Sequence, residues 1–183
     1  MITLDFCASI RLWYTNHEKN QVQDKMILLP LMKNNNFENL KSIEGHFFTQ
    51  TLSAGGKWLH YKLLLVEHGY IEASIKVRKE MTNPSNQLHG GMISMIADEL
   101  CGLSFYSMGY DTFYTTVSLN VNFLYSADLD STVIVKAKVL RSGKKIANVE
   151  CTLYDDNERI IAHATSNLVN TNSKIFNLTM RES

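Results

Sequence analysis

The sequence predicts an α+β fold in which one long, very apolar helix lies against an antiparallel sheet. Met92–Met108 is apolar on nearly every side, and a helix of that kind is buried over most of its surface. The segments around it alternate apolar and polar residues as strands do. The turns between them are too short for the crossovers that parallel strands need. Such a helix has to be wrapped by a curved sheet or covered by a partner chain.

The composition is that of a single soluble domain. The chain has 183 residues, 45% of them apolar and 20% charged, and its 18 basic residues balance 18 acidic ones. This balance argues against a nucleic-acid-binding protein, and no apolar run approaches the ~18–20 residues of a membrane span. Three scattered cysteines suit neither a disulfide framework nor a metal cluster, and the start lacks the basic region of a signal peptide. We expect a cytoplasmic protein without a metal site.

The N-terminal part is predicted to be an extension. The pattern assigns no element to residues 1–35. Apolar residues then recur every three or four positions, which predicts a helix at about 36–52. Ser53–Gly56 would end this helix, because glycine relieves a helix terminus at no steric cost. The predicted division is an N-terminal extension (1–52), a domain (53–170) and a frayed C-terminal tail (171–183).

A hairpin is expected before the central helix and four strands after it. The hairpin consists of Trp58–Val66 and Tyr70–Lys79, joined by a turn at Glu67–Gly69. Ser142-Gly143 and Asp155–Asn157 are short turns between the last three strands, as in an antiparallel meander. The four later strands are predicted at Tyr114–Tyr125, Thr132–Leu140, Lys145–Tyr154 and Arg159–Val169.

Two carboxylates interrupt the apolar helix. Asp98 and Glu99 are the only acidic residues within 81–110, and a buried carboxylate is costly unless it is partnered or used. Helical spacing puts Asp98 on a face of small residues with Gly91 and Gly102, which leaves room for a ligand. Burial statistics alone favour a solvated edge or an ion pair for both carboxylates.

Leu88-His89-Gly90-Gly91 directly precedes this helix. Paired glycines at a helix start let a ligand approach free backbone N–H donors, and the helix dipole adds positive potential there. A carbonyl oxygen that becomes negative during acyl transfer would be stabilised at such a place. Taken alone the motif is weak, because a glycine pair often makes only a tight connection and a single His there is more often structural.

Together these features resemble the hotdog-fold acyl-CoA thioesterases, specifically the PaaI-like subgroup. The signature of that family is an Asn-Pro loop, an HGG motif and an acidic residue in the following helix, matched here by Asn83-Pro84, His89–Gly91 and Asp98. The resemblance covers roughly 58–169 and is specific over Asn83–Gly102. It implies that a curved antiparallel sheet wraps the long helix, and that the protein hydrolyses a thioester to a carboxylic acid and free coenzyme A. No cofactor is implied, since coenzyme A is part of the substrate.

The resemblance also implies catalytic roles. Asp98 corresponds to the acidic residue that acts on the thioester, as general base for water or as nucleophile. The Gly90 N–H and the Asn83 side-chain amide would bind the thioester oxygen. His89 would orient Asn83 or its loop rather than attack.

Further residues are expected at the same site. A hydroxyl that positions the water is expected at Thr116, with Thr115 and Ser118 as close rivals. Gly91 and Glu99 are expected to contact the substrate.

The family builds each site from two subunits, so the resemblance implies a homodimer, commonly a dimer of dimers. The expected small-molecule partner is an acyl-CoA, or an acyl-carrier protein in its place, and neither nucleic acid nor membrane is expected to bind. Asn86 stands where relatives often have Gly, and Asn tolerates left-handed backbone. The strand ends in Phe123–Ala127, where many relatives have Arg-Pro, so this chain lacks the Arg for any contact made there.

The fold also allows two rival functions. A hydratase of this fold pairs its Asp with a His five residues later, but here that position is Leu103. A non-catalytic acyl-CoA sensor is the rival from another class, and turnover of a pure acyl-CoA separates it from an enzyme.

Overall fold

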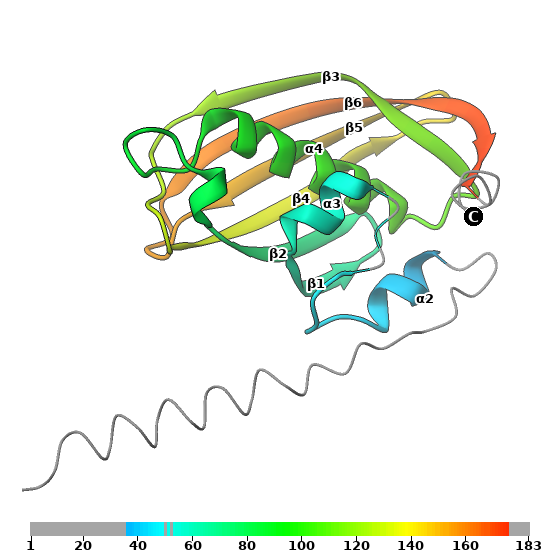
Figure 1. The fold of residues 1–183 in the computed structure, drawn as a ribbon. Coiled ribbons are helices and arrows are strands. Elements are labelled where there is room, and N and C mark those ends of the chain that lie inside the picture. Colours follow the sequence, from blue (N-terminus) through cyan, green and yellow to red (C-terminus); the bar gives the residue numbers. More distant parts are fainter. Residues whose placement is uncertain (1–35, 50, 52, 176–183) are drawn as a thin grey trace, which may run out of the picture. The chain divides into compact units, whose positions relative to one another are not determined.

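The computed structural model describes residues 36–49, 51 and 53–175, all within the unit Leu31–Ser183 (Figure 1). The predictions for 1–35 and for the end of the tail lie outside these residues. The helices are α2 (Asn36–Lys41), α3 (Ala54–Leu59), the short 3-10 helix η1 (Lys79–Met81) and α4 (Gly90–Tyr106). The strands are β1 (Lys62–Glu67), β2 (Tyr70–Lys76), β3 (Thr112–Phe123), β4 (Thr132–Ser142), β5 (Ile146–Tyr154) and β6 (Ile160–Lys174).

The six strands form one antiparallel sheet in the order β1-β2-β4-β5-β6-β3, and α4 lies against one face of it (Figure 1). Alternate residues of each strand face the helix. In β2 these are Ile71, Ala73 and Ile75, none more than 1% exposed, which confirms the alternation that predicted this strand. The predicted α+β arrangement of one long helix and an antiparallel sheet is confirmed.

Helix α4 supplies the centre of the core. Ile96, Ala97, Leu100 and Cys101 are fully buried against the sheet. Burying a side chain the size of Leu100 contributes about 1.5–3 kcal/mol, so this helix is a main source of stability. One face remains open, and Asp98 lies exposed on it.

Strand β3 does not join the predicted meander at β4. Strands β4, β5 and β6 follow one another through short turns as expected, whereas β3 pairs only with β6 and β4 pairs with β2 on its other side. The connection 124–131 is long enough to cross the end of the sheet, which a tight turn is not. Strand β3 is therefore an edge strand.

The helix predicted at about 36–52 is wrong in length. Helix α2 ends at Lys41, turns follow, and Gly45 has φ +84°. Phe47 then forms a bridge with Lys62, and the Phe48 N–H donates to the Tyr61 carbonyl at 2.9 Å. The helical spacing of apolar residues continued through a glycine turn into an extended segment, and spacing alone does not separate the two.

Ser53–Gly56 begins a helix instead of ending one. Ser53 is the N-cap of α3, and its hydroxyl accepts a hydrogen bond from the Gly56 N–H at 3.0 Å. Trp58 and Leu59, which were predicted to begin the first strand, form the last turn of α3. His60 ends that helix with φ 53°, so β1 begins only at Lys62.

The frayed tail predicted from residue 171 begins too early. Strand β6 continues to Lys174, which pairs with Thr112 at the start of β3, and the Thr171 hydroxyl donates to the Phe113 carbonyl at 2.8 Å. Leu40 and Phe48 belong to the core with 1% and 7% exposure, although the prediction placed them in the extension. The domain boundaries themselves stay predictions.

None of the helices within the described residues combines the length and the apolar character that crossing a membrane requires.

Candidate active site

His89 is the N-cap of α4. Its φ and ψ of −67° and 138° are extended, and its Nδ1 accepts a hydrogen bond from the Gly91 N–H at 2.9 Å. The His89 carbonyl accepts from Met92 and Ile93 at 2.8 and 3.0 Å. An accepting Nδ1 carries no proton, so in this arrangement the ring bears its proton on Nε2. The imidazole thereby takes the role that Ser, Asp or Asn usually has at a helix start.

Gly90 is the first residue of α4, and its N–H has no acceptor among the described residues. The first N–H groups of a helix lack partners within the helix and lie at its positive end. A Cβ at this position would be 3.4 Å from the Phe123 ring of β3, so the backbone here runs close to that aromatic side chain. The Gly90 N–H is thus a free donor beside an apolar ring.

Asn83 shapes the loop before the helix. Its Oδ1 accepts hydrogen bonds from the N–H groups of Ser85 and Gln87 at 2.9 and 3.1 Å, an Asx turn. Within the described part of the chain its Nδ2 has no acceptor, so this amide can donate outward. The backbone N–H of His89 donates to the Met81 carbonyl at 2.9 Å, whereas no described contact links its ring to Asn83.

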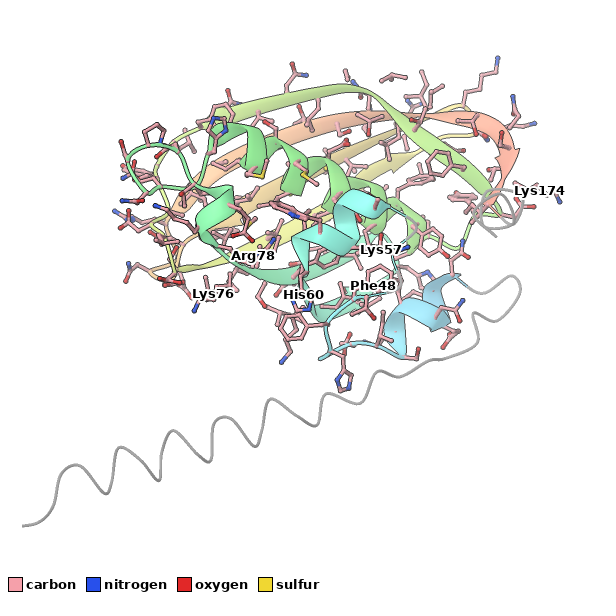
Figure 2. All side chains as sticks on the ribbon, in the orientation of Figure 1. Phe48, Lys57, His60, Lys76, Arg78 and Lys174 are labelled. Carbon is pink, nitrogen blue, oxygen red and sulfur yellow. The ribbon has the colours of Figure 1, made fainter. Side chains whose placement is uncertain are left out.

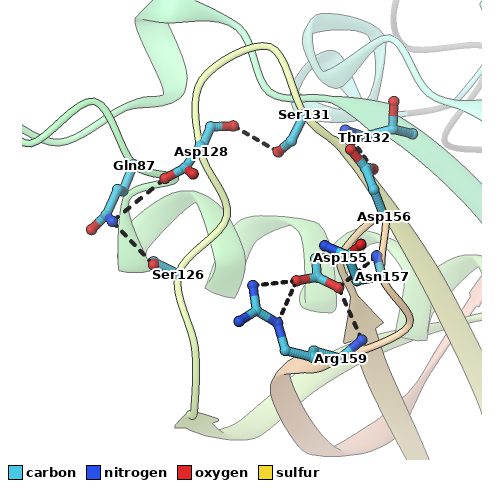
Figure 3. A network of polar contacts seen from close by, with 9 residues as sticks. All are labelled: Gln87, Ser126, Asp128, Ser131, Thr132, Asp155, Asp156, Asn157 and Arg159. Carbon is cyan, nitrogen blue, oxygen red and sulfur yellow. Dashed lines mark hydrogen bonds and ion pairs between the residues drawn. The ribbon is translucent and has the colours of Figure 1, made fainter.

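The loop is held to the connection between β3 and β4 (Figure 3). The Gln87 Nε2 donates to the Ser126 hydroxyl at 3.0 Å, and the Leu88 N–H donates to the Ala127 carbonyl at 2.8 Å. Asn86 has φ 57°, which confirms that an Asn can hold the left-handed backbone of this position. The loop that carries Asn83 is therefore fixed by its neighbours.

Asp98 is exposed on the open face of α4, and its Oδ1 accepts a hydrogen bond from the Thr116 hydroxyl at 2.7 Å. Thr115 and Ser118 do not make this contact. The Ser118 hydroxyl instead accepts from the Asn167 side-chain amide at 2.7 Å. Of the three hydroxyls weighed from the sequence, the structure brings Thr116 to the carboxylate.

Glu99 faces another side of α4. Its Oε1 accepts hydrogen bonds from the Thr51 and Tyr61 hydroxyls at 2.9 and 3.1 Å. Burial raises the pKa of Tyr61 well above its ordinary value, and the nearby Glu99 charge raises it further, so this phenol stays a donor. Sequence reasoning missed both donors, because they lie 48 and 38 residues away and neither stands in a motif. A contact of Glu99 or Gly91 with a substrate stays a prediction.

Asp98 and the free N–H of Gly90 are far apart within one chain. Asp98 follows Gly90 by eight residues of the same helix. At a rise of about 1.5 Å per residue the two lie roughly 12 Å apart along the axis. Catalysis at one carbonyl needs its base and its oxyanion donor each about 3 Å from the reacting atoms.

Over the described residues, no cluster of three or more His, Cys, Asp or Glu side chains is placed to hold a metal ion.

Part of the chain is similar to known proteins. Residues 86–162 match the family model of the thioesterase superfamily. Human acyl-coenzyme A thioesterase 13 is 27% identical over 79 residues, 43% of this chain and 56% of that protein. A relative from Schizosaccharomyces pombe is 30% identical over 95 residues, 51% of this chain and 59% of that protein. The chain thus spans less than two thirds of the length of these relatives.

Solved structures share the fold. The PaaI protein from the phenylacetic acid degradation operon of E. coli superposes with a TM-score of 0.60 at 19% identity, over 64% of this chain and 88% of that one. The smu.793 protein of Streptococcus mutans bound to acetyl CoA gives 0.58 at 22% identity, over 61% and 88%. At these identities the likeness shows the fold alone. Residues 86–162 are thus similar to the thioesterase superfamily, and the long helix on an antiparallel sheet is the hotdog fold of the PaaI-like structural neighbours.

Proposed function

We propose that the protein hydrolyses an acyl-coenzyme A thioester to a carboxylic acid and free coenzyme A. The observation that carries this proposal is the hydrogen bond from the Thr116 hydroxyl to the exposed Asp98 carboxylate at 2.7 Å. The bond fixes one carboxylate oxygen and leaves the other turned to solvent as a base. An exposed carboxylate on the most apolar helix, within the segment that matches the thioesterase superfamily, supports a role in activating water.

The chemistry follows from the two groups. Asp98 takes a proton from a water molecule, whose oxygen attacks the thioester carbonyl carbon. The carbonyl oxygen becomes negative and is stabilised by the N–H of Gly90 and the Nδ2 of Asn83. When the tetrahedral species collapses, the carbon–sulfur bond breaks, and the coenzyme A thiolate leaves and takes up the proton. Thr116 orients the carboxylate throughout.

The site is proposed to need two copies of the chain, with Asp98 from one and Gly90 from the other. The separation of roughly 12 Å along one helix supports a site shared between two copies. Strand β3 offers a surface for the second copy: it is an edge strand, and Val117 and Phe123 on it are 60% and 56% exposed. Unpaired strand edges with apolar side chains readily pair with another chain. A homodimer is therefore proposed; the dimer of dimers and the cytoplasmic location stay predictions.

The relatives support coenzyme A as the leaving group. The human relative is named an acyl-coenzyme A thioesterase, and the Streptococcus mutans neighbour is bound to acetyl CoA. A hydratase is disfavoured by the structure as well, because Leu103, five residues after Asp98, is only 7% exposed and faces the core.

The test is release of thiol from acetyl-, hexanoyl-, palmitoyl- and benzoyl-CoA by the wild type and by Asp98→Asn. The substitution keeps the size of the side chain and an oxygen for Thr116, and loses only basicity. We expect kcat to fall about 100- to 10,000-fold, the range for losing a general base, in a variant that stays folded and dimeric. Near-normal turnover by folded Asp98→Asn would place the base elsewhere. Acyl-CoA binding without turnover by the wild type would favour the sensor.

A further inference from the structure

Glu99 is next to Asp98 in the chain but holds a different segment. Asp98 is exposed and bonded to Thr116 of β3, whereas Glu99 is half-buried and bonded to Thr51 and Tyr61. Hydrogen bonds from neutral hydroxyls to a carboxylate are charge-assisted and stronger than those between neutral groups. The two adjacent carboxylates therefore serve different sides of α4.

The contacts of Glu99 lead directly to the start of α3. The Thr51 hydroxyl that donates to Glu99 also accepts the Ser53 N–H at 3.2 Å, and Ser53 caps α3. Tyr61, which follows α3, is fully buried, so its ring anchors the other donor in the core. Glu99 thus joins the residues before and after α3 to the central helix; we call Glu99, Thr51 and Tyr61 the carboxylate latch.

The backbone of α3 lies directly on α4. A Cβ on Gly56 would be 2.0 Å from Glu99 Oε1, and a Cβ on Gly55 would be 2.7 Å from the Met95 methyl carbon. Only a residue without a side chain fits at Gly56 while Glu99 accepts its hydrogen bonds from Thr51 and Tyr61. The Gly-Gly pair therefore allows the close approach that the latch holds.

Arg78 holds the other end of α3. Its guanidinium donates to the Leu59 and Trp58 carbonyls at 2.9 and 2.8 Å and lies 4.8 Å from the centre of the Trp58 ring. Arg78 is labelled in Figure 2. These carbonyls are among the unpaired acceptors at a helix C-terminus. With the latch at its start and Arg78 at its end, α3 is a fixed element.

Helix α3 borders the open face of α4 that carries Asp98. Met95 precedes Asp98 by three residues, so the two lie on neighbouring positions of one face. Further along this face, a Cβ on Gly102 would meet nothing within 4 Å. Toward the start of α4, this face carries the half-buried Met95 side chain, whose methyl carbon packs against Gly55 of α3.

We propose that Glu99 is a positioning residue: the carboxylate latch fixes α3 beside Asp98, and α3 with Met95 forms the wall that limits the length of the acyl group. This rests on the proposed thioester hydrolysis. Met95 and the α3 backbone present an apolar and a tightly packed surface, which suits an aliphatic chain and resists its extension.

The first test weakens the hydrogen bonds that hold α3 in place. Thr51→Val and Tyr61→Phe each remove one hydroxyl and keep the volume of the side chain, and Thr51→Ser is the matched control that keeps the hydroxyl. The readout is the ratio of kcat/KM for dodecanoyl-CoA to that for butanoyl-CoA. We expect the ratio to rise in both variants, by about fourfold for each methylene that gains a buried place. Thr51→Ser should keep the wild-type ratio, and butanoyl-CoA turnover should persist in all three.

The second test narrows the space available to the acyl group. Gly55→Ala places a methyl group 2.7 Å from the flexible end of Met95, which has to shift. We expect it to shift toward the Asp98 face. The same ratio is then expected to fall, opposite to the effect of Thr51→Val, mostly through a higher KM for the long substrate. An equal fall in kcat/KM for both substrates would contradict the proposal that α3 and Met95 limit the length of the acyl group.

Fluorescence separates the latch from the enzyme activity. In full-length chains with Trp13→Phe, Trp58 on α3 is the remaining tryptophan, and its quenching by acrylamide reports how firmly α3 is held. Quenching should increase in Thr51→Val and not in Thr51→Ser. Unchanged quenching in Thr51→Val would contradict the claim that the carboxylate latch fixes α3. Increased quenching with an unchanged substrate ratio would contradict the claim that α3 and Met95 limit the acyl length. Absence of thiol release from every substrate by the wild type would instead overturn the proposed function.

Discussion

At the scale of single residues, the contact between Thr116 and Asp98 joins an edge strand to the open face of the central helix. The Thr116 hydroxyl donates to the carboxylate at 2.7 Å, a short bond of the kind that charged acceptors form. It restricts the rotation of Asp98, which otherwise projects into solvent. The proposed base is therefore held in one orientation before a substrate arrives.

Removing this hydroxyl should slow catalysis without unfolding the protein. We expect Thr116→Val to lower kcat about tenfold, since a hydrogen bond to a charged group is worth about 1.5–3 kcal/mol and part of it is replaced by water. Thr116→Ser should recover most of the loss. Thr115→Val, one residue away and exposed, is the control. Equal losses in Thr115→Val and Thr116→Val would show that the strand, and not the hydrogen bond, matters.

The same scale shows what sequence reasoning can reach. Asp98, His89 and Gly90 were found because they lie within one short segment, and Thr116 was one of three possibilities. The partners of Glu99 were out of reach, since Thr51 and Tyr61 are distant in the chain and only folding brings them to it. Spacing on a helix indicates the face of a residue but not what packs against that face.

At the scale of elements, α4 begins at an unusual cap. His89 accepts the Gly91 N–H at 2.9 Å through Nδ1, and the two glycines after it have low helix propensity. The cap therefore carries more of the helix start than it would before better helix formers, and it also fixes the position of the Gly90 N–H.

His89→Ala should lower both the thermal stability and the activity. Loss of a cap costs about 1 kcal/mol, which for a domain of this size lowers Tm by roughly 3 °C. His89→Asn, with a good capping side chain, should restore Tm. Thermal unfolding and thiol release measured on both variants check this. A His89→Ala protein with wild-type Tm and wild-type turnover would show that the ring neither stabilises the start of α4 nor supports catalysis.

Long periodic elements were predictable, and short ones were not. α4 and the strands have many residues that repeat one pattern, so a few exceptions do not hide it. Helix α3 has six residues, two of them Gly, and its formation depends on the packing of Gly55 and Gly56 against α4. The end of β6 depends on pairing with the start of β3, which the local sequence does not report.

At the scale of the whole molecule, the separation of Asp98 and Gly90 along α4 supports the proposed site between two copies of the chain. The proposed base, Asp98, and the Gly90 N–H, which has no acceptor among the described residues, lie on one helix, roughly 12 Å apart along its axis. Two such helices side by side in opposite directions bring the Asp98 of each toward the Gly90 of the other. The exposed apolar residues of β3, the strand that holds Asp98, are then covered by the same association.

The most direct test of the account mixes two inactive variants. Asp98→Asn lacks the base. Gly90→Pro lacks the N–H, yet Pro is favoured at the first position of a helix, and the extended backbone of His89 is compatible with a following Pro. Gly90→Ala, which keeps the N–H, is the control and should retain activity.

In a mixed dimer, one site receives both substitutions and the other receives neither. When the two variants are refolded together, random pairing makes half of the dimers mixed, and each of these has one intact site. The account predicts that thiol release returns to about a quarter of the wild-type rate. A mixture no more active than its separate components would contradict a site built from Asp98 of one copy and Gly90 of the other.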